Sequence, residues 1–288
     1  MKVVIGGGRG YVGQALAAAL VADGHDVVVL SRQPGRFSGP GRPAGWDAAA
    51  AEIDGAAAVV NLAGVSIGGP RWTRSRKAAI LGSRVETTQA LASEIAAAER
   101  RPGVFVSASG IDYYGDSGDA IVDEGSPAGS SFLSRVCTAW EEAAAGAGVP
   151  HVAVRTALVV GPGALSIRLM ALPFRLLAGG RVGGGRQWFP WIHLDDLVAV
   201  YRLAIDGRVA GPVNAVAPQQ LRQRDAARDF GAALHRPAAV PTPAAAVRLL
   251  LGEEADLVLH GQRAVSSKLD DVVFRYRELR AALESALR

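Results

Sequence analysis

The chain has 288 residues, 49% of them hydrophobic and 20% charged, so it can bury a packed core and is neither disordered nor fibrous. Its 31 Lys and Arg exceed its 27 Asp and Glu by four, and they are scattered along the chain, so we expect no nucleic-acid partner. The single cysteine, Cys137, excludes an internal disulfide, and the five histidines lack metal-ligand spacing. No apolar run approaches the roughly 18 residues of a membrane span, and the run after Lys2 is too short for a signal peptide. We therefore expect a soluble, cytoplasmic protein with no metal site and no membrane partner.

The predicted elements alternate between strands and helices. Strands are expected at 3–5, 25–30, 58–62, 103–108 and 151–160, with helices at 11–22, 73–100 and 131–145 between them. This alternation predicts βαβ units and a parallel sheet, which is an α/β fold of the doubly wound, Rossmann type. Beyond residue 160 the pattern loosens: glycines predict loops at 179–185, residues 188–196 form an aromatic island, and helices broken by prolines follow from about 217.

Three glycines follow the first predicted strand. Gly7, Gly10 and Gly13 are spaced three apart and open the first predicted helix. Glycines there let the backbone turn tightly and approach a pyrophosphate, whose charge is stabilised at the helix N-terminus. In a strand–loop–helix followed by a second strand, the pattern predicts a dinucleotide site, and the alternative is a tight turn without a ligand.

The end of the second strand indicates which nicotinamide cofactor binds. NAD sites usually place Asp or Glu there to bind the ribose 2′-hydroxyl, whereas this chain has Leu30, Ser31 and Arg32. Ser31 brings no repelling carboxylate, and the planar guanidinium of Arg32 can pair with a 2′-phosphate. We therefore predict NADP(H), with Arg9 as a further contact. The alternative for Arg32 is a solvated loop residue.

Several motifs resemble the extended short-chain dehydrogenase/reductases. They are GGGRGYVG at 6–13, NLAG at 61–64, SASGIDYYG at 107–115, VRTALVVGPG at 154–163 and WIHLDDL at 191–197. Other segments are similar to an atypical, epimerase-like bacterial branch with a small C-terminal domain of unknown function, namely 71–88, 132–142, 184–197, 211–218, 235–243 and 249–263. The resemblance implies that the cofactor also contacts Tyr11, Val12, Leu62, Ala63 and Gly64. It implies an NAD(P)-binding Rossmann domain at 1–215, with a substrate-side segment at about 161–192, and a small, mostly helical domain at 216–288.

The superfamily's proton-donating pair is missing. It is a tyrosine whose pKa is lowered by a lysine four residues later, and none of the five tyrosines here has a lysine at that spacing. Counted back from Glu141, the resemblance places Leu133 at the tyrosine position and Cys137 at the lysine position. It places Arg84 at the usual asparagine, and Ser109 at the usual serine.

Other residues are candidates for the missing chemistry, each with a structural alternative. Tyr113, Tyr114 and Asp112 follow the fourth predicted strand, where α/β sites lie, but Tyr114 with Gly115 also resembles a structural turn of the superfamily. Cys137 is a candidate nucleophile or a buried, inert thiol.

Arg84 could bind an anionic ligand or lie on a helix surface. Trp72, Trp188, Phe189 and Trp191 form either an apolar lid or part of the core. His193, followed by Asp195 and Asp196, indicates the start of a helix.

Three hypotheses follow for the function. The first is an NADP-dependent oxidoreductase or epimerase-like enzyme that acts on an unidentified small molecule, with Ser109, Arg84 and Tyr114 polarising and orienting the substrate. The second is a non-catalytic NADP(H) sensor, and the third an isomerase or eliminating enzyme that uses the nicotinamide as structure. The sequence leaves the substrate and the oligomeric state open.

Overall fold

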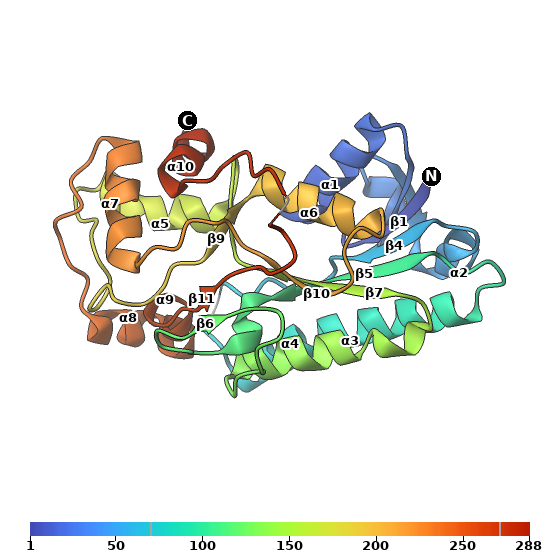
Figure 1. The fold of residues 1–288 in the computed structure, drawn as a ribbon, viewed down its shortest axis with the longest axis horizontal. Helices are drawn as coiled ribbons and strands as arrows, with labels where there is room; N and C mark the ends of the chain where they lie inside the picture. The colour runs from blue at the N-terminus through green and yellow to red at the C-terminus, as the bar shows by residue number, and fades with distance from the viewer. Residues whose placement is uncertain (70, 271) are drawn as a thin grey trace.

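The computed structural model describes every residue except 70 and 271. Its centre is a seven-stranded sheet in which each pair of neighbours is parallel, in the order β10-β7-β5-β4-β1-β2-β3 (Figure 1). The strands are β1 (Lys2–Gly6), β2 (Asp26–Ser31), β3 (Arg42–Gly45), β4 (Ala58–Asn61), β5 (Val104–Gly110), β7 (His151–Thr156) and β10 (Gly211–Ala215). The fold is the Rossmann-type doubly wound sheet that the sequence predicts.

Helices cover both faces of this sheet. In Figure 1, α1 (Tyr11–Ala22) and α6 (Leu194–Ile205) lie above it, and α3 (Arg74–Ala97) and α4 (Phe132–Glu142) below. The strands are therefore buried on both faces and form continuous apolar runs. Side chains alternate along β1: Val3 and Ile5 pack on the α1 side, and Val4 packs in the opposite core with Leu91 of α3.

Both edge strands are absent from the sequence prediction. β3 has the sequence RPAG and β10 has GPVNA, so neither shows the β-branched run that marks the inner strands. Each is short and contains a proline, which the edge of a sheet tolerates because one side of the strand has no ladder to complete.

The predicted strand at 151–160 is in fact two strands. β7 ends at Thr156, and β8 (Leu158–Val160) pairs with β9 (Trp191–His193) in a separate two-stranded sheet. The aromatic island thus contains a strand and the start of α6. Ala157 still donates its N–H to Ala215 of β10 in the main sheet, whereas the next N–H, that of Leu158, donates to Pro190 just before β9.

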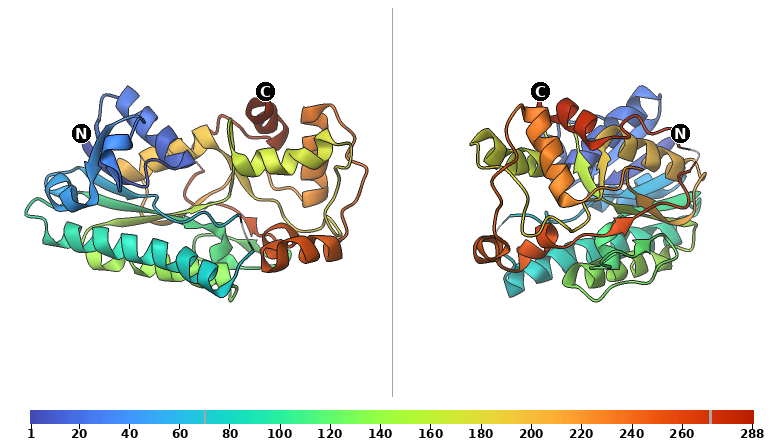
Figure 2. Two further views of the ribbon diagram at one scale, coloured as in Figure 1. Left: turned by 180° about the vertical axis from the view of Figure 1, so that it is seen from behind. Right: turned by 60° about the vertical axis from the view of Figure 1, so that its left-hand side comes forward.

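A second hydrophobic core lies beside the Rossmann portion. Three helices surround it, α5 (Leu165–Arg175), α7 (Gln223–Leu234) and α10 (Leu279–Leu287), and Trp191 and Phe230 are buried among them (Figure 2). The remaining elements are α2 (Ala49–Ile53), β6 (Ile121–Val122), α8 (Ala244–Leu251), α9 (Asp256–Leu259), β11 (Arg263–Ala264) and the short 3-10 helices Pro34–Arg36, Trp46–Ala48, Ile111–Tyr114, Ala145–Ala147 and Gly252–Ala255. β11 pairs with β6, which joins the C-terminal portion to the loop that follows β5.

Candidate functional site

The loop between β1 and α1 is shaped by close backbone contacts. Gly7 has a φ of +80°, and a Cβ there would lie 2.5 Å from the backbone nitrogen of Ala63. A Cβ on Gly13 would lie 2.5 Å from the carbonyl oxygen of Gly7. Only glycine fits at either position without a shift of the backbone.

The start of α1 is left open to an anion. Its N-cap residue, Gly10, provides no side-chain hydrogen bond, and its first turn contains no acidic residue. The N–H groups of Tyr11, Val12 and Gly13 belong to the first turn and have no partner within the helix. This arrangement is an anion cradle of the kind that holds a pyrophosphate.

The end of β2 carries an exposed guanidinium, that of Arg32. Ser31 is buried, and its hydroxyl accepts the N–H of Gln33 at 3.1 Å. Arg32 is exposed, and its side chain makes no hydrogen bond or ion pair within the part of the chain that the structure describes. Arg9 is likewise exposed, in the glycine loop. A phosphate at the end of β2 would therefore lie near the positive charge of Arg32. No acidic residue stands at positions 30 to 32 to repel it.

The loop after β4 is fixed beside the glycine loop by a buried polar cluster that sequence analysis missed. Asn61 accepts the N–H of Ala63 at 3.0 Å and donates to the hydroxyl of Thr88 at 2.8 Å. The indole of Trp140 donates to the same hydroxyl at 2.9 Å. These bonds link β4, α3 and α4 and hold Leu62 and Ala63 against Gly7.

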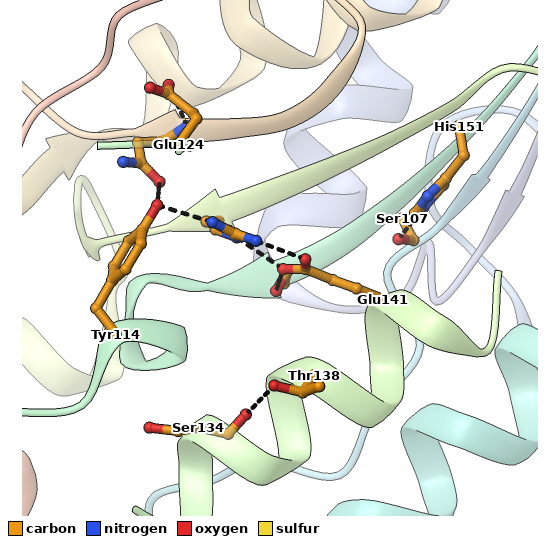
Figure 3. Close-up of polar contacts among 10 residues, drawn as sticks. Ser107, Tyr114, Glu124, Ser134, Thr138, Glu141 and His151 are labelled. Atoms are coloured by element: carbon orange, nitrogen blue, oxygen red, sulfur yellow. Dashed lines mark hydrogen bonds and ion pairs between the residues drawn. The ribbon is translucent and has the colours of Figure 1, made fainter. Parts of the chain in front are cut away.

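Ser109 belongs to a buried ion-pair cluster near the end of β5. Its hydroxyl donates to Glu141 Oε1 at 2.6 Å, and Arg155 grips the same carboxylate through Nε and Nη2 at 2.9 and 2.8 Å. Ser109 and Arg155 face each other in the β5–β7 register, which is why the two side chains reach one carboxylate of α4. Figure 3 shows Glu141 at the centre of this cluster.

Tyr114 belongs to the same cluster, and both sides of its hydroxyl are engaged. The hydroxyl donates to Asn214 Oδ1 at 2.7 Å and accepts from Arg155 Nη1 at 2.9 Å (Figure 3). Burial raises the pKa of Tyr114 above its usual value, although the bond from Arg155 opposes the shift. The ring of Tyr113 lies 3.4 Å from the guanidinium carbon of Arg155. This environment is that of a structural tyrosine.

The cluster extends to the C-terminal portion through Glu124. Its Oε1 accepts the N–H of Asn214 at 2.9 Å and the hydroxyl of Ser266 at 2.6 Å, while Oε2 accepts the N–H and hydroxyl of Ser267, both at 2.8 Å. Burial alone would raise the pKa of Glu124, but these donors lower it below its usual value. The carboxylate is therefore ionised and fully bonded.

Cys137 and Asp112 lie together at the end of β5. A Cβ on Gly110 would lie 3.5 Å from Cys137 Sγ and 3.6 Å from Asp112 Oδ2. Burial and the charge of Asp112 raise the pKa of Cys137 to about 12, so this thiol is protonated at neutral pH and is a poor nucleophile. Burial raises the pKa of Asp112 to about 6. Asp112 is thus the group here whose protonation changes near neutral pH.

Arg84 is buried rather than exposed on the surface of α3. Its Nη1 donates to the carbonyl oxygens of Val65 at 2.9 Å and Ile80 at 3.0 Å. Its Cζ lies 5.0 Å from the centre of the Trp140 ring. A Cβ on Gly64 would lie 3.1 Å from the same Cζ atom. Burial lowers the pKa of Arg84 below its usual value. Its position connects the β4 loop with α4.

The remaining aromatic candidates mostly serve packing. Trp191 is fully buried, Phe189 packs beside Phe230 and Trp72 packs edge-on against Phe132 at 5.3 Å. His193 caps α6, where its Nδ1 accepts the N–H of Asp195 at 3.1 Å, so the predicted helix start is confirmed.

With residues 70 and 271 set aside, no group of three or more His, Cys, Asp or Glu is placed to hold a metal. Nor does any helix among the described residues have the length and apolar character to cross a bilayer.

A parallel sheet in this order, with a glycine cradle at the β1–α1 turn, defines a Rossmann-type nucleotide-binding protein. The chain belongs to the NAD dependent epimerase/dehydratase family, whose pattern matches residues 3–216. A second pattern, described as a domain of unknown function (DUF1731), matches residues 242–286.

Relatives match the chain along its whole length. Human epimerase family protein SDR39U1 is 40% identical over 293 residues, which cover 99% of both chains, and YfhF of Bacillus subtilis is 32% identical over 100% of this chain and 98% of its own. A crystal structure of human SDR39U1 (isoform 2) with NADPH has a TM-score of 0.91 at 39% identity and covers 99% of this chain and 98% of that one. A nucleoside-diphosphate sugar epimerase from Corynebacterium glutamicum, 34% identical, has a TM-score of 0.78 and covers 100% of this chain and 58% of its own.

Proposed function

We propose that this protein binds NADP(H) and catalyses hydride transfer between the nicotinamide and a small carbonyl or alcohol substrate. The observation that carries the proposal is the cradle formed by Gly7, Gly10 and Gly13, together with the exposed guanidinium of Arg32 at the end of β2. The cradle fits a pyrophosphate, and Arg32 fits a 2′-phosphate. The NADPH in the crystal structure of human SDR39U1 supports the same cofactor.

The proposed reaction needs a group that stabilises negative charge. Bound NADPH would supply hydride to a carbonyl carbon, so the carbonyl oxygen gains the electron pair of its π bond. The proton of Ser109 is held by Glu141, which leaves its oxygen to accept a hydrogen bond from a hydroxyl group of the substrate and orient it. The positive charge of Arg84 would stabilise the developing oxyanion through space, without a hydrogen bond to it.

The reaction also needs a proton donor, and we assign this role to Asp112. Its carboxyl has a pKa of about 6, which matches proton transfer near neutral pH. The other acidic candidates are less suited: the hydroxyl of Tyr114 is committed to Asn214 and Arg155, and the thiol of Cys137 has a pKa near 12. We therefore propose that Tyr114 and Cys137 position the site instead of exchanging protons.

Two measurements test the proposal. Fluorescence titration with NADPH and NADH should show tighter binding of NADPH, and Arg32→Ala should remove that preference while Arg36→Ala, an exposed neighbour in the same loop, leaves it intact. NADPH oxidation should then be followed with ketones, quinones and nucleotide sugars. Turnover that falls by about 100-fold or more in Asp112→Asn, with NADPH affinity unchanged, supports the assigned donor. The absence of binding to either cofactor contradicts the proposal.

A second candidate is an NADP(H) sensor without turnover. It is favoured by the bonded path from Ser109 through Glu141, Arg155 and Tyr114 to Asn214, which bonds to Glu124 and so to Ser266. Such a path connects the cofactor edge with the C-terminal portion. NADPH binding without oxidation by any substrate, accompanied by altered hydrogen exchange at 263–267, would favour this candidate over the enzyme.

A further inference from the structure

One edge of the Arg84 guanidinium makes no hydrogen bond to the residues that the structure describes. Nη1 is used by the carbonyl oxygens of Val65 and Ile80, but Nε is buried without a hydrogen bond among the described residues. The side chain is also outside ion-pair distance of every carboxylate in the described ranges 1–69, 71–270 and 272–288. A buried cation with an unfilled donor edge is costly, so the arrangement calls for an anion that the chain itself does not provide.

Arg155 shows how the corresponding guanidinium edge is bound by a carboxylate elsewhere in this chain. Its Nε and Nη2 bind the two oxygens of Glu141 at 2.9 and 2.8 Å, a bidentate pair between two nearly buried groups. The same Nε–Nη2 edge of Arg84 lacks its carboxylate. Since a guanidinium edge and a carboxylate match in spacing and planarity, the missing group at Arg84 has the shape of a carboxylate.

Positive charge accumulates around this edge. Arg76 lies two turns earlier on α3, and its Nε too is buried without a partner among the described residues, while Nη2 donates to Ser66 at 2.5 Å. Burial and the charge of Arg76 both lower the pKa of Arg84. Two neighbouring cations that repel each other favour an anion more strongly than one cation does.

The unfilled edge belongs to the site described above. Arg84 contacts Gly64 of the loop that packs on Gly7, and it lies within electrostatic reach of Cys137 on α4. Cys137 in turn lies beside Gly110, one residue after Ser109. A ligand group bound by Arg84 would thus lie among the ends of β4 and β5, which is the edge of the sheet where α/β sites are found.

We propose that the substrate carries a carboxylate, and that the Nε–Nη2 edge of Arg84 binds it as Arg155 binds Glu141. That the bound acid undergoes hydride transfer rests on the proposed function, but the binding of its carboxylate by Arg84 does not. The substrate class is therefore a small carboxylic acid with a carbonyl or hydroxyl group close to the carboxylate, since Cys137 lies near both Arg84 and Asp112, the assigned proton donor.

Calorimetry with oxalate and its uncharged counterpart oxamide tests the inference without cofactor. The wild-type protein should bind oxalate and not oxamide, and Arg84→Met should weaken oxalate binding by about 10- to 100-fold, the loss expected for a charge-assisted pair. Arg84→Lys, which keeps the charge without the planar edge, should give an intermediate loss. Arg74→Met, an exposed position on the same helix, is the matched control and should bind oxalate as the wild type does.

The outcomes separate this inference from the proposed function. Equal affinity for oxalate and oxamide, or undiminished oxalate binding in Arg84→Met, overturns the carboxylate site, whatever the NADPH titration shows. Failure to bind NADPH with oxalate binding intact overturns the proposed function alone. A thermal melt and the NADPH affinity of Arg84→Met provide the check on folding, and if both match the wild type, lost oxalate binding is assigned to the missing guanidinium.

Discussion

The two ends of the site are built from different materials. The cradle between β1 and α1 consists of backbone: glycines in close contact and the open N–H groups of a helix. The region around β5 and α4 consists of buried charged side chains: Arg155 binds both oxygens of a carboxylate, whereas Nε of Arg84 has no hydrogen bond to any residue that the structure describes. A binding site made of backbone tolerates few residue types, whereas a site made of side chains can exchange its chemistry while the fold stays the same.

Removing Glu141 should have the largest effect on stability. Glu141→Ala leaves the guanidinium of Arg155 buried without its anion, and we expect a loss of about 3–5 kcal/mol in the free energy of unfolding. Urea denaturation measures it, with the exposed neighbour Glu142→Ala as the control. A loss below about 1 kcal/mol would show that water reaches the guanidinium of Arg155. The charged cluster around β5 and α4 would then not depend on the ion pair between Glu141 and Arg155.

A side chain at Gly13 should disrupt the glycine cradle between β1 and α1. A Cβ at this position meets the Gly7 carbonyl oxygen at 2.5 Å, so Gly13→Val forces the loop away from α1. We expect a loss of about 1–3 kcal/mol in unfolding free energy and a fall in NADPH affinity of about 100-fold or more. Gly35→Ala is a suitable control, because a Cβ at Gly35 meets nothing within 4 Å and no positive φ is required there. Unchanged NADPH affinity in Gly13→Val would place the cofactor elsewhere.

Asp112 makes stability depend on pH. Its pKa is about 6 in the folded protein and near 3.8 when unfolded, so between these pH values the folded state holds the extra proton and stability falls as pH rises. Asp112→Asn should therefore gain about 1–2 kcal/mol over the wild type at pH 7.5, and little at pH 4. Unfolding curves at the two pH values measure the difference. An equal gain at both would mean that the carboxyl does not titrate in this range.

Arg84→Met should have the smallest effect on stability. The variant loses two hydrogen bonds to carbonyl groups, but it also removes a buried cation that has no carboxylate partner in the described part of the chain, so we expect a change within about 1 kcal/mol. This variant can be compared directly with Glu141→Ala. Glu141→Ala removes the anion from a buried arginine, whereas Arg84→Met removes a buried arginine at the same edge of the sheet. A loss of several kcal/mol would reveal that Arg84 is already well satisfied by the protein.

The same contrast explains what the sequence could predict. The cradle depends on spacing along one segment, so Gly7, Gly10 and Gly13 could be identified directly, as could the inner strands with their β-branched runs. The ion pair of Glu141 and Arg155 depends on the register that sets Ser109 opposite Arg155, and no local pattern carries that register. Asn61 and Thr88 were missed for the same reason, since 26 intervening residues separate the two partners. The edge strands β3 and β10 were missed because neither has a strong strand composition.

The carboxylate of Glu124 ties the end of the chain to the rim of the sheet. Its two oxygens take four donors, three of them from Ser266 and Ser267. A chain shortened before residue 263 would keep this charge in its buried position and lose most of the groups that solvate it. The last quarter of the polypeptide and the nucleotide-binding portion are thus expected to melt together, as one cooperative unit with a single transition.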